Sequence, residues 1–209
     1  VLFRSVYLFK PRVLEEMLQG NRDWQDFGKD VIPNSLKTHR VYAHVFPGFW
    51  EDIGTVRSYY EVSMELTSPN APFRFYDPDR PIFTGARHLP GSLIQEATIS
   101  HSILCEGGRI SKTQISNSII GIRSVIQPDA VVDRSVLMGA DFFEERPERA
   151  SIPLGIGPGS QISGAIIDKN ARIGKNVVIR GNSGAADVVC DDYCIVDGIV
   201  VVRRGATIP

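Results

Sequence analysis

Aliphatic residues recur at intervals of five or six positions through the second half of this 209-residue chain. The first nine form three groups of three, in which each residue recurs sixteen positions later: Ile94, Ile99 and Leu104, then Ile110, Ile115 and Ile120, then Ile126, Val131 and Val136. Small or polar residues separate them. So short a repeat leaves room for one short strand per face with one inward aliphatic side chain, which is typical of a three-sided parallel β-solenoid.

The same rhythm resumes after an interruption at residues 140–153, with Ile156, Ile162, Ile167, Ile173 and Ile179. Antiparallel hairpins could use the same aliphatics, but the two-residue Asn-Gly or Asp-Gly turns that such hairpins favour are absent between these runs. The spacing therefore predicts a parallel solenoid, although it does not give its handedness.

The first part of the chain has an α/β pattern instead. Apolar runs predict strands at Val6–Phe9 and Val41–Phe46, and helical spacing predicts one helix carrying Val13, Leu14, Met17 and Leu18 and another over Val56–Leu66. Residues 71–90 contain four of the thirteen prolines, with aromatic residues between them, and indicate an extended, packed connector. We expect a first domain over residues 1–66, a connector over 67–90 and a solenoid over 91–209.

Composition excludes several classes of protein. The 23 basic and 24 acidic residues leave a net charge of −1, so no global field would attract nucleic acid or an anionic membrane. No apolar run approaches the roughly 18 residues of a membrane-spanning helix, and we expect a cytoplasmic protein. The odd number of cysteines fits free thiols, and the spacing of Cys190 and Cys194 alone is weak evidence for zinc.

The segment Trp50–Thr55 combines an aromatic residue, two carboxylates and a glycine. An aromatic ring offers a sugar a flat apolar face, a carboxylate can hold Mg²⁺ beside phosphate oxygens, and Gly54 permits close backbone approach. These are properties of a sugar-phosphate site. The alternative is a strand-to-helix turn in which Asp52 caps the helix that begins at Val56.

This segment and many others resemble the nucleotidyltransferases that make nucleotide sugars, and among them the glucose-1-phosphate adenylyltransferases, or ADP-glucose pyrophosphorylases. The resemblance runs through nearly the whole chain in the family's order, over residues 6–9, 26–33, 50–61, 75–78, 81–84, 138–141, 153–157, 167–174 and 198–202. It implies a Rossmann-like nucleotidyltransferase domain followed by a left-handed parallel β-helix.

The resemblance also implies a reaction and a set of site residues. The family converts ATP and α-D-glucose 1-phosphate into ADP-glucose and diphosphate for glycogen or starch synthesis, with Mg²⁺ as cofactor. By resemblance Asp52 is a catalytic metal ligand, and Tyr7, Asp26, Phe27 and Trp50 line the glucose pocket. The alternatives are a turn or helix cap for Asp26 and core packing for the three aromatic residues.

Some parts of the family pattern are missing from this sequence. The glycine- and arginine-rich triphosphate loop, the first metal-binding aspartate and the lysine that grips the sugar phosphate lie upstream in relatives. The resemblance therefore suggests a C-terminal portion, which alone is expected to lack adenylyltransferase activity. Phe3 stands where relatives have a sugar-contacting serine, and Val1–Ser5 is interpreted as a foreign leader.

Relatives bind anionic sugar-phosphate or nucleotide effectors between the solenoid and the catalytic domain. Matching by position assigns Arg149, Lys169 and Arg204 to such an allosteric site, with Arg123 as a weaker candidate. Guanidinium and ammonium groups suit phosphate. The alternative for each is a solvated charge at a solenoid corner.

Solenoid ends and their unpaired edges require capping or burial against another chain. Relatives form tetramers, and we expect a homo-oligomer here. Two rival functions remain: a non-catalytic regulatory or assembly module, and a hexapeptide-repeat acyltransferase that would use His101 as its base. The second gives the Trp50–Thr55 segment no role.

Overall fold

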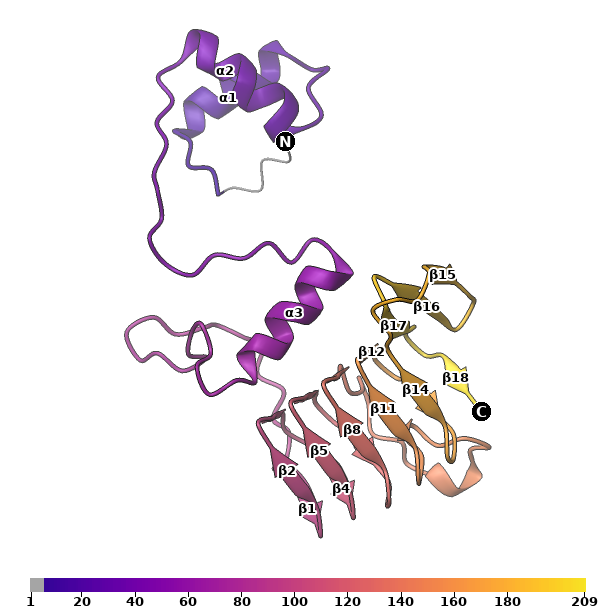
Figure 1. The fold of residues 1–209 in the computed structure, drawn as a ribbon. Helices are drawn as coiled ribbons and strands as arrows, with labels where there is room; N and C mark the ends of the chain where they lie inside the picture. The colour runs from indigo at the N-terminus through magenta and orange to yellow at the C-terminus, as the bar shows by residue number, and fades with distance from the viewer. Residues whose placement is uncertain (1–5) are drawn as a thin grey trace. The chain divides into compact units, whose positions relative to one another are not determined.

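A computed structural model describes residues 6–209 (Figure 1). The prediction about Val1–Ser5 lies outside the described residues. The chain forms two compact units, the first ending at Asp52 and the second running from Ile53 to Pro209. Each is described by itself.

The first unit is helical. Helix α1 (Pro11–Gly20) begins with proline at a position where a missing N–H costs nothing, and it buries Met17, as the apolar spacing predicted. A π-helical turn, η1 (Phe27–Val31), then leads directly into α2 (Ile32–Thr38).

The two strands predicted in this unit are wrong. Residues 6–10 and 40–48 have no regular structure. An apolar run becomes a strand only where another strand pairs its backbone N–H and C=O groups, and residues 6–52 contain no strand to do so.

The second unit is a three-sided solenoid (Figure 1). Its first sheet contains, in spatial order, β1 (Leu93–Gln95), β4 (Arg109–Ser111), β7 (Val125–Ile126), β10 (Gly155–Ile156), β13 (Arg172–Ile173) and β18 (Thr207–Ile208). The second contains β2 (Thr98–Ser100), β5 (Gln114–Ser116), β8 (Val131–Asp133), β11 (Gln161–Ser163) and β14 (Val178–Arg180). The third contains β3 (Ile103–Leu104), β6 (Ile119–Ile120), β9 (Val136–Leu137), β12 (Ala165–Ile167), β17 (Ile199–Val202), β16 (Tyr193–Val196) and β15 (Val188–Val189).

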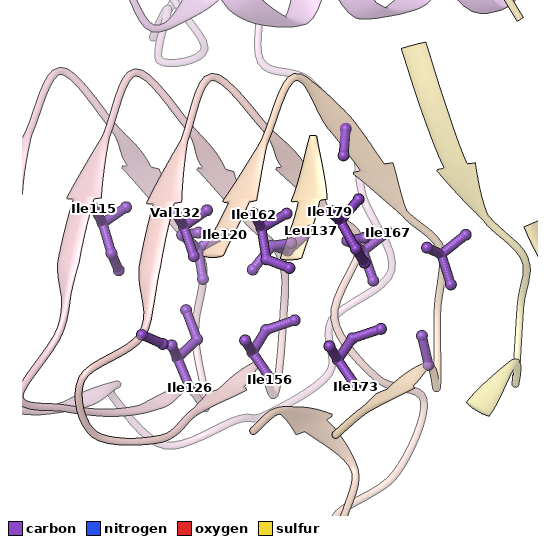
Figure 2. Close-up of a cluster of buried hydrophobic side chains, with 14 of the residues drawn as sticks. Ile115, Ile120, Ile126, Val132, Leu137, Ile156, Ile162, Ile167, Ile173 and Ile179 are labelled. Atoms are coloured by element: carbon purple, nitrogen blue, oxygen red, sulfur yellow. The ribbon is translucent and has the colours of Figure 1, made fainter. Parts of the chain in front are cut away.

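The inward side chains of the three sheets form one stacked core (Figure 2). The predicted aliphatics from Ile110 to Ile126 and from Ile156 to Ile179 all belong to it, which confirms the solenoid. The sixteen-residue spacing does not continue into the third coil, however. The inward residues there are Val132 and Leu137, so the prediction that Val131 and Val136 point inward is wrong.

An extra residue at one corner explains this shift of register. Ile110 pairs with Ile126 sixteen residues later, whereas Ile115 pairs with Val132 and Ile120 with Leu137, seventeen residues later. The additional residue lies between β7 and β8. Because side chains alternate between faces of a strand, a slip of one residue exchanges the inward and outward positions.

Helix α3 (Val56–Leu66) covers the outer face of the third sheet. Val136, Ile166 and Ile199 are buried there against Val56 and Met64, among other α3 residues. The Tyr60 hydroxyl also donates to the Arg134 carbonyl oxygen at 2.7 Å. The helix predicted at this position is confirmed, and it packs within the unit that contains the solenoid.

Two excursions interrupt the coils. Residues 141–153, here called the strap, leave the solenoid after β9 and include a short 3₁₀ turn, η2 (Pro147–Arg149). The second excursion follows β14, and there β15 pairs with β16 and β16 with β17 in two successive antiparallel hairpins. The turn between β16 and β17 is Asp197–Gly198, both with positive φ, an Asp-Gly turn that lies beyond the aliphatic runs ending at Ile179.

The segment between α3 and the solenoid, residues 67–90, contains neither helix nor strand. Phe75, Tyr76 and Phe83 are exposed in it, whereas Phe73 is half-buried and its ring meets the Phe75 ring edge-on at 5.0 Å, so the expected packing of the aromatic residues holds only in part. Among residues 6–209, no helix combines the length and the apolar composition needed to cross a membrane.

Candidate functional site

Two of the three predicted effector residues meet at one corner of the solenoid. Lys169 Nζ lies 2.8 Å from Asp141 Oδ1, and the Arg204 guanidinium donates to the other carboxylate oxygen, Asp141 Oδ2. Asn170 completes the cluster: its side-chain amide donates to Asp141 Oδ2 at 3.0 Å, and its carbonyl oxygen accepts the Asp141 N–H at 2.9 Å. We call these four residues the Asp141 cluster.

The coil register brings Lys169 and Arg204 together. Ile167 of β12 pairs with Val202 of β17, and each cation follows its strand by two residues. The Gly205 N–H then donates to the Lys169 carbonyl oxygen at 2.9 Å, which ties the two corners to each other. Two residues 35 apart in sequence are thus neighbours on adjacent coils.

Asp141 reaches the same corner from the coil on the other side. β9 pairs with β12, and the chain leaves β9 through Gly139, whose φ is +80°. A Cβ at this glycine would collide with the Ile122 carbonyl oxygen, so the close approach of two coils requires glycine here. The Asn170 N–H donates to the Gly139 carbonyl oxygen at 3.0 Å, which fixes the start of the strap on the next coil.

The charges of the Asp141 cluster do not cancel. Hydrogen bonds from Lys169 and Asn170, together with the charge of Arg204, lower the pKa of Asp141 to about 2. At neutral pH the set carries two positive charges and one negative charge, a net charge of +1. The side chains of Lys169 and Asp141 are each about one-third exposed and that of Arg204 is 62% exposed, so an anion in solvent can reach them.

Arg149, the third predicted effector residue, does not join this cluster. It lies exposed in η2 on the strap, and none of the ion pairs found among residues 6–209 involves it. Arg123, the weaker candidate, packs over the Phe143 ring at 5.4 Å and donates to the Ala140 carbonyl oxygen at 3.2 Å. Arg123 therefore binds the strap, and no hydrogen bond found in residues 6–209 joins it to Lys169 or Arg204.

A second carboxylate also binds the strap to the solenoid. Glu144 Oε1 lies 2.7 Å from Arg172 Nη1, and Glu144 Oε2 accepts the Leu154 N–H at 2.8 Å. Burial disfavours the charged form, but these two partners outweigh it, so the pKa of Glu144 lies below its usual value. Arg172 also donates to the Ile152 carbonyl oxygen at 2.8 Å.

The predicted glucose-pocket residues lie in the first unit and are gathered only in part. The Tyr7 and Phe27 rings stack with centroids 6.0 Å apart. Asp26 precedes η1, and its Oδ1 accepts the Lys29 N–H at 2.8 Å, so the helix-cap alternative describes its position. Trp50 is 57% exposed, and none of the ring contacts found in the described residues places it beside Tyr7 or Phe27.

The turn at Asp26 has an unusual backbone. The Asp30 and Val31 N–H groups both donate to the Asp26 carbonyl oxygen, and the second bond spans five residues. Single π-turns of this kind occur often at functional sites. A depression of about 470 Å³ between α1 and α2 is lined by other residues, including Trp24 and His39.

Asp52 does not cap α3, so that alternative is wrong. Thr55 is the N-cap: its hydroxyl oxygen accepts the Ser58 N–H at 3.1 Å, and Ser58 Oγ accepts the Thr55 N–H at 3.2 Å. This reciprocal arrangement satisfies two N–H groups at the helix start. Within residues 6–209, no three His, Cys, Asp or Glu side chains come together as a metal site.

The side chains of Cys190 and Cys194 point to opposite faces of the β15–β16 hairpin. Val189 pairs with Cys194, while the Cys190 N–H donates to the Tyr193 carbonyl oxygen at 2.9 Å, so Cys190 lies opposite Tyr193. Neighbouring positions along a strand point to opposite faces. The two thiols therefore do not converge on a metal, and both cysteines are free, as predicted.

Asp141 and Asn170 are the site residues that sequence reasoning missed. Both lie in segments that carried the family resemblance, yet neither was assigned a role. The available signal was position: polar residues that lie a few positions after aligned strands of adjacent coils come near the same corner.

Two family models match the sequence. The model described as a GLGC left-handed parallel β-helix domain matches residues 87–209, the region of the solenoid. The model described as nucleotidyl transferase matches residues 3–69. The first match covers more than half of the chain and gives the solenoid its left hand. The chain therefore belongs to the GLGC left-handed parallel β-helix family, that of the ADP-glucose pyrophosphorylases, with nucleotidyl transferase sequence ahead of its solenoid.

Proposed function

We propose that this protein functions in the synthesis of ADP-glucose from ATP and glucose 1-phosphate, and that its solenoid binds an anionic sugar-phosphate or nucleotide effector. The nucleotidyl transferase match, followed along the chain by the β-helix match, supports nucleotidyl transfer. The observation that carries the regulatory part is the meeting of Lys169 and Arg204 at one solvent-accessible corner.

In the proposed sugar site, side chains of the first unit bind and orient glucose 1-phosphate. The stacked Tyr7 and Phe27 rings offer an apolar wall, Trp50 offers a further exposed ring, and Asp26 has carboxylate oxygens suited to sugar hydroxyl groups. Holding the sugar phosphate in line with the α-phosphorus of ATP lowers the barrier by orientation.

Asp52 is proposed as the magnesium ligand of this chain. Mg²⁺ is commonly held by one or two carboxylates together with substrate phosphates and water, and a single aspartate suits that mode. When bound, the ion neutralises charge on the triphosphate. Asp52 would then keep that charge at a fixed place beside the sugar phosphate.

At the proposed effector site, Lys169 and Arg204 bind phosphate oxygens through charge-assisted hydrogen bonds. Arg149 is proposed to join them only if the strap changes position, because its present contacts are elsewhere. We further propose a cytoplasmic homo-oligomer, a tetramer as in relatives, in which neither nucleic acid nor a membrane is a partner.

The catalytic proposal is tested by Asp52→Asn in the protein as its gene encodes it. The amide keeps the shape of the side chain but removes its charge, so kcat for ADP-glucose formation should fall by roughly 10²-fold, the scale of one lost electrostatic contact. Glu51→Gln, a neighbouring carboxylate that we assign no role, is the matched control. Equal turnover in both variants and wild type would remove Asp52 from the reaction.

A further inference from the structure

The strap begins inside the proposed effector site. Asp141 is its first residue, and its carboxylate contacts Lys169 and Arg204, the same two cations that we assign to the effector. A phosphate group cannot make the same contacts while both carboxylate oxygens are engaged there. The protein thus supplies its own anion at this corner.

We propose that Asp141 is a built-in competitor of the effector, so that anion binding to Lys169 and Arg204 displaces the Asp141 carboxylate and releases the start of the strap. This inference rests on the proposed effector site. It adds a consequence that the site alone does not have: binding energy at the corner is coupled to the position of residues 141–146.

Charge and geometry both support this competition. One carboxylate shared by two cations leaves a net charge of +1, whereas a phosphate dianion brings more charge and more acceptor oxygens to the same donors. The Asp141 cluster is also accessible to solvent, since none of its three charged side chains is fully buried. Exchange of one anion for another at such a site does not require unfolding of the solenoid.

The other contacts of the strap explain why its release would be local. Glu144 stays bound to Arg172 and to the Leu154 N–H, and Phe143 packs against Arg123. These anchors do not involve Lys169 or Arg204. Release of Asp141 would therefore free the first few residues of the strap and leave its end attached to the first sheet.

Asp141→Asn provides the direct test, with inorganic phosphate as the probe and calorimetry at constant ionic strength as the measurement. If Asp141 competes, removal of its charge should tighten phosphate binding about five- to tenfold, which lies within the usual range of coupling energies. Glu144→Gln is the matched control, because it removes a strap carboxylate that pairs with a different cation; it should leave phosphate affinity unchanged.

The opposite result has a clear meaning. If Asp141→Asn binds phosphate as weakly as wild type, or more weakly, Asp141 positions the cations and does not compete, and the inference is wrong. Lys169→Gln separates this failure from that of the proposed site. If it weakens phosphate binding, the effector site stands; if it has no effect, the site itself is wrong.

Hydrogen exchange of the wild-type protein gives a second test that needs no variant. The Asp141 N–H, which donates to Asn170, should exchange faster when phosphate is added, while the Leu154 N–H, bound to Glu144, should not change. Equal protection of the Asp141 amide with and without saturating phosphate would contradict the inference, even if Asp141→Asn did not fold.

Discussion

A ladder of serine hydroxyl groups stabilises one corner of the solenoid. The Ser118 N–H donates to Ser102 Oγ, the Ser135 N–H to Ser118 Oγ, and the Ala165 N–H to Ser135 Oγ, at 3.1, 3.1 and 3.3 Å. Ser118 and Ser135 are fully buried. Each hydroxyl also donates to a carbonyl oxygen two residues earlier, so the ladder satisfies polar groups that the corner cannot expose to water.

Ser118→Ala removes the centre of this ladder. The Ser135 N–H and the Ser116 carbonyl oxygen both lose a buried partner, so the free energy of unfolding should fall by about 1 to 3 kcal/mol. Denaturant unfolding measures this change. Ser100→Ala, at an exposed position of the neighbouring strand, should change stability by less than about 0.5 kcal/mol, and equal effects of the two substitutions would contradict the ladder.

Thr113 presents the opposite case. Its Oγ1 is buried and finds no hydrogen-bond partner in the structure of residues 6–209. Replacement by valine removes the unsatisfied hydroxyl and keeps the branched shape, so the unfolding free energy should rise by about 1 kcal/mol. Thr98→Val, at an exposed position on the paired coil, serves as control. A loss of stability in Thr113→Val would mean that the hydroxyl has a partner.

Two elements pack on the outside of the solenoid. Helix α3 covers the third sheet, and the strap is bound through the ion pairs of Asp141 and Glu144. The third sheet is apolar on both sides, because Leu137 and Ile167 face the core while Val136 and Ile166 face α3. Adjacent aliphatic pairs therefore indicate a sheet covered on both faces. That signal was present in the sequence.

Thr55→Ala tests how α3 begins. The substitution removes the hydroxyl that accepts the Ser58 N–H, so it should destabilise the second unit by about 1 kcal/mol. Thr55→Ser keeps an equivalent oxygen and should restore most of the loss. The unfolding midpoints of the three proteins decide the matter; an unstable Thr55→Ser protein would show that the methyl group, and not the cap, is what matters.

Attachment of the strap should depend on pH in the acidic range. The pKa of Asp141 in the folded protein is about 2, against an ordinary value of 3.8, so its contribution to stability is complete above about pH 4 and is lost as the pH falls through 2. The stability difference between wild type and Asp141→Asn, measured by thermal unfolding, should therefore shrink between pH 5 and pH 2. A constant difference would contradict the ion-paired state.

For the whole molecule, periodicity predicted the solenoid because one inward aliphatic per short strand is a local rule. It could not locate an inserted corner residue between Ile126 and Val132, since corners tolerate one more residue without loss of core packing. Resemblance nominated Lys169 and Arg204 separately; only the stacking of coils shows that they share Asp141. The strands expected at residues 6–9 and 41–46 failed because strand pairing is not a local property.

If the solenoid senses an anion at Lys169, binding of that anion must change the rate of nucleotidyl transfer. The most direct test is the effector response of Lys169→Gln in the protein as its gene encodes it, with ADP-glucose formation measured against fructose 1,6-bisphosphate, 3-phosphoglycerate and AMP. Loss of one charge-assisted contact, about 1.5 to 3 kcal/mol, predicts that the half-effective concentration rises tenfold or more while the rate without effector is unchanged. Lys175→Gln, at an exposed solenoid lysine outside the Asp141 cluster, should behave as wild type. A Lys169→Gln response curve that superimposes on the wild-type curve at the same ionic strength would show that Lys169 does not bind the effector.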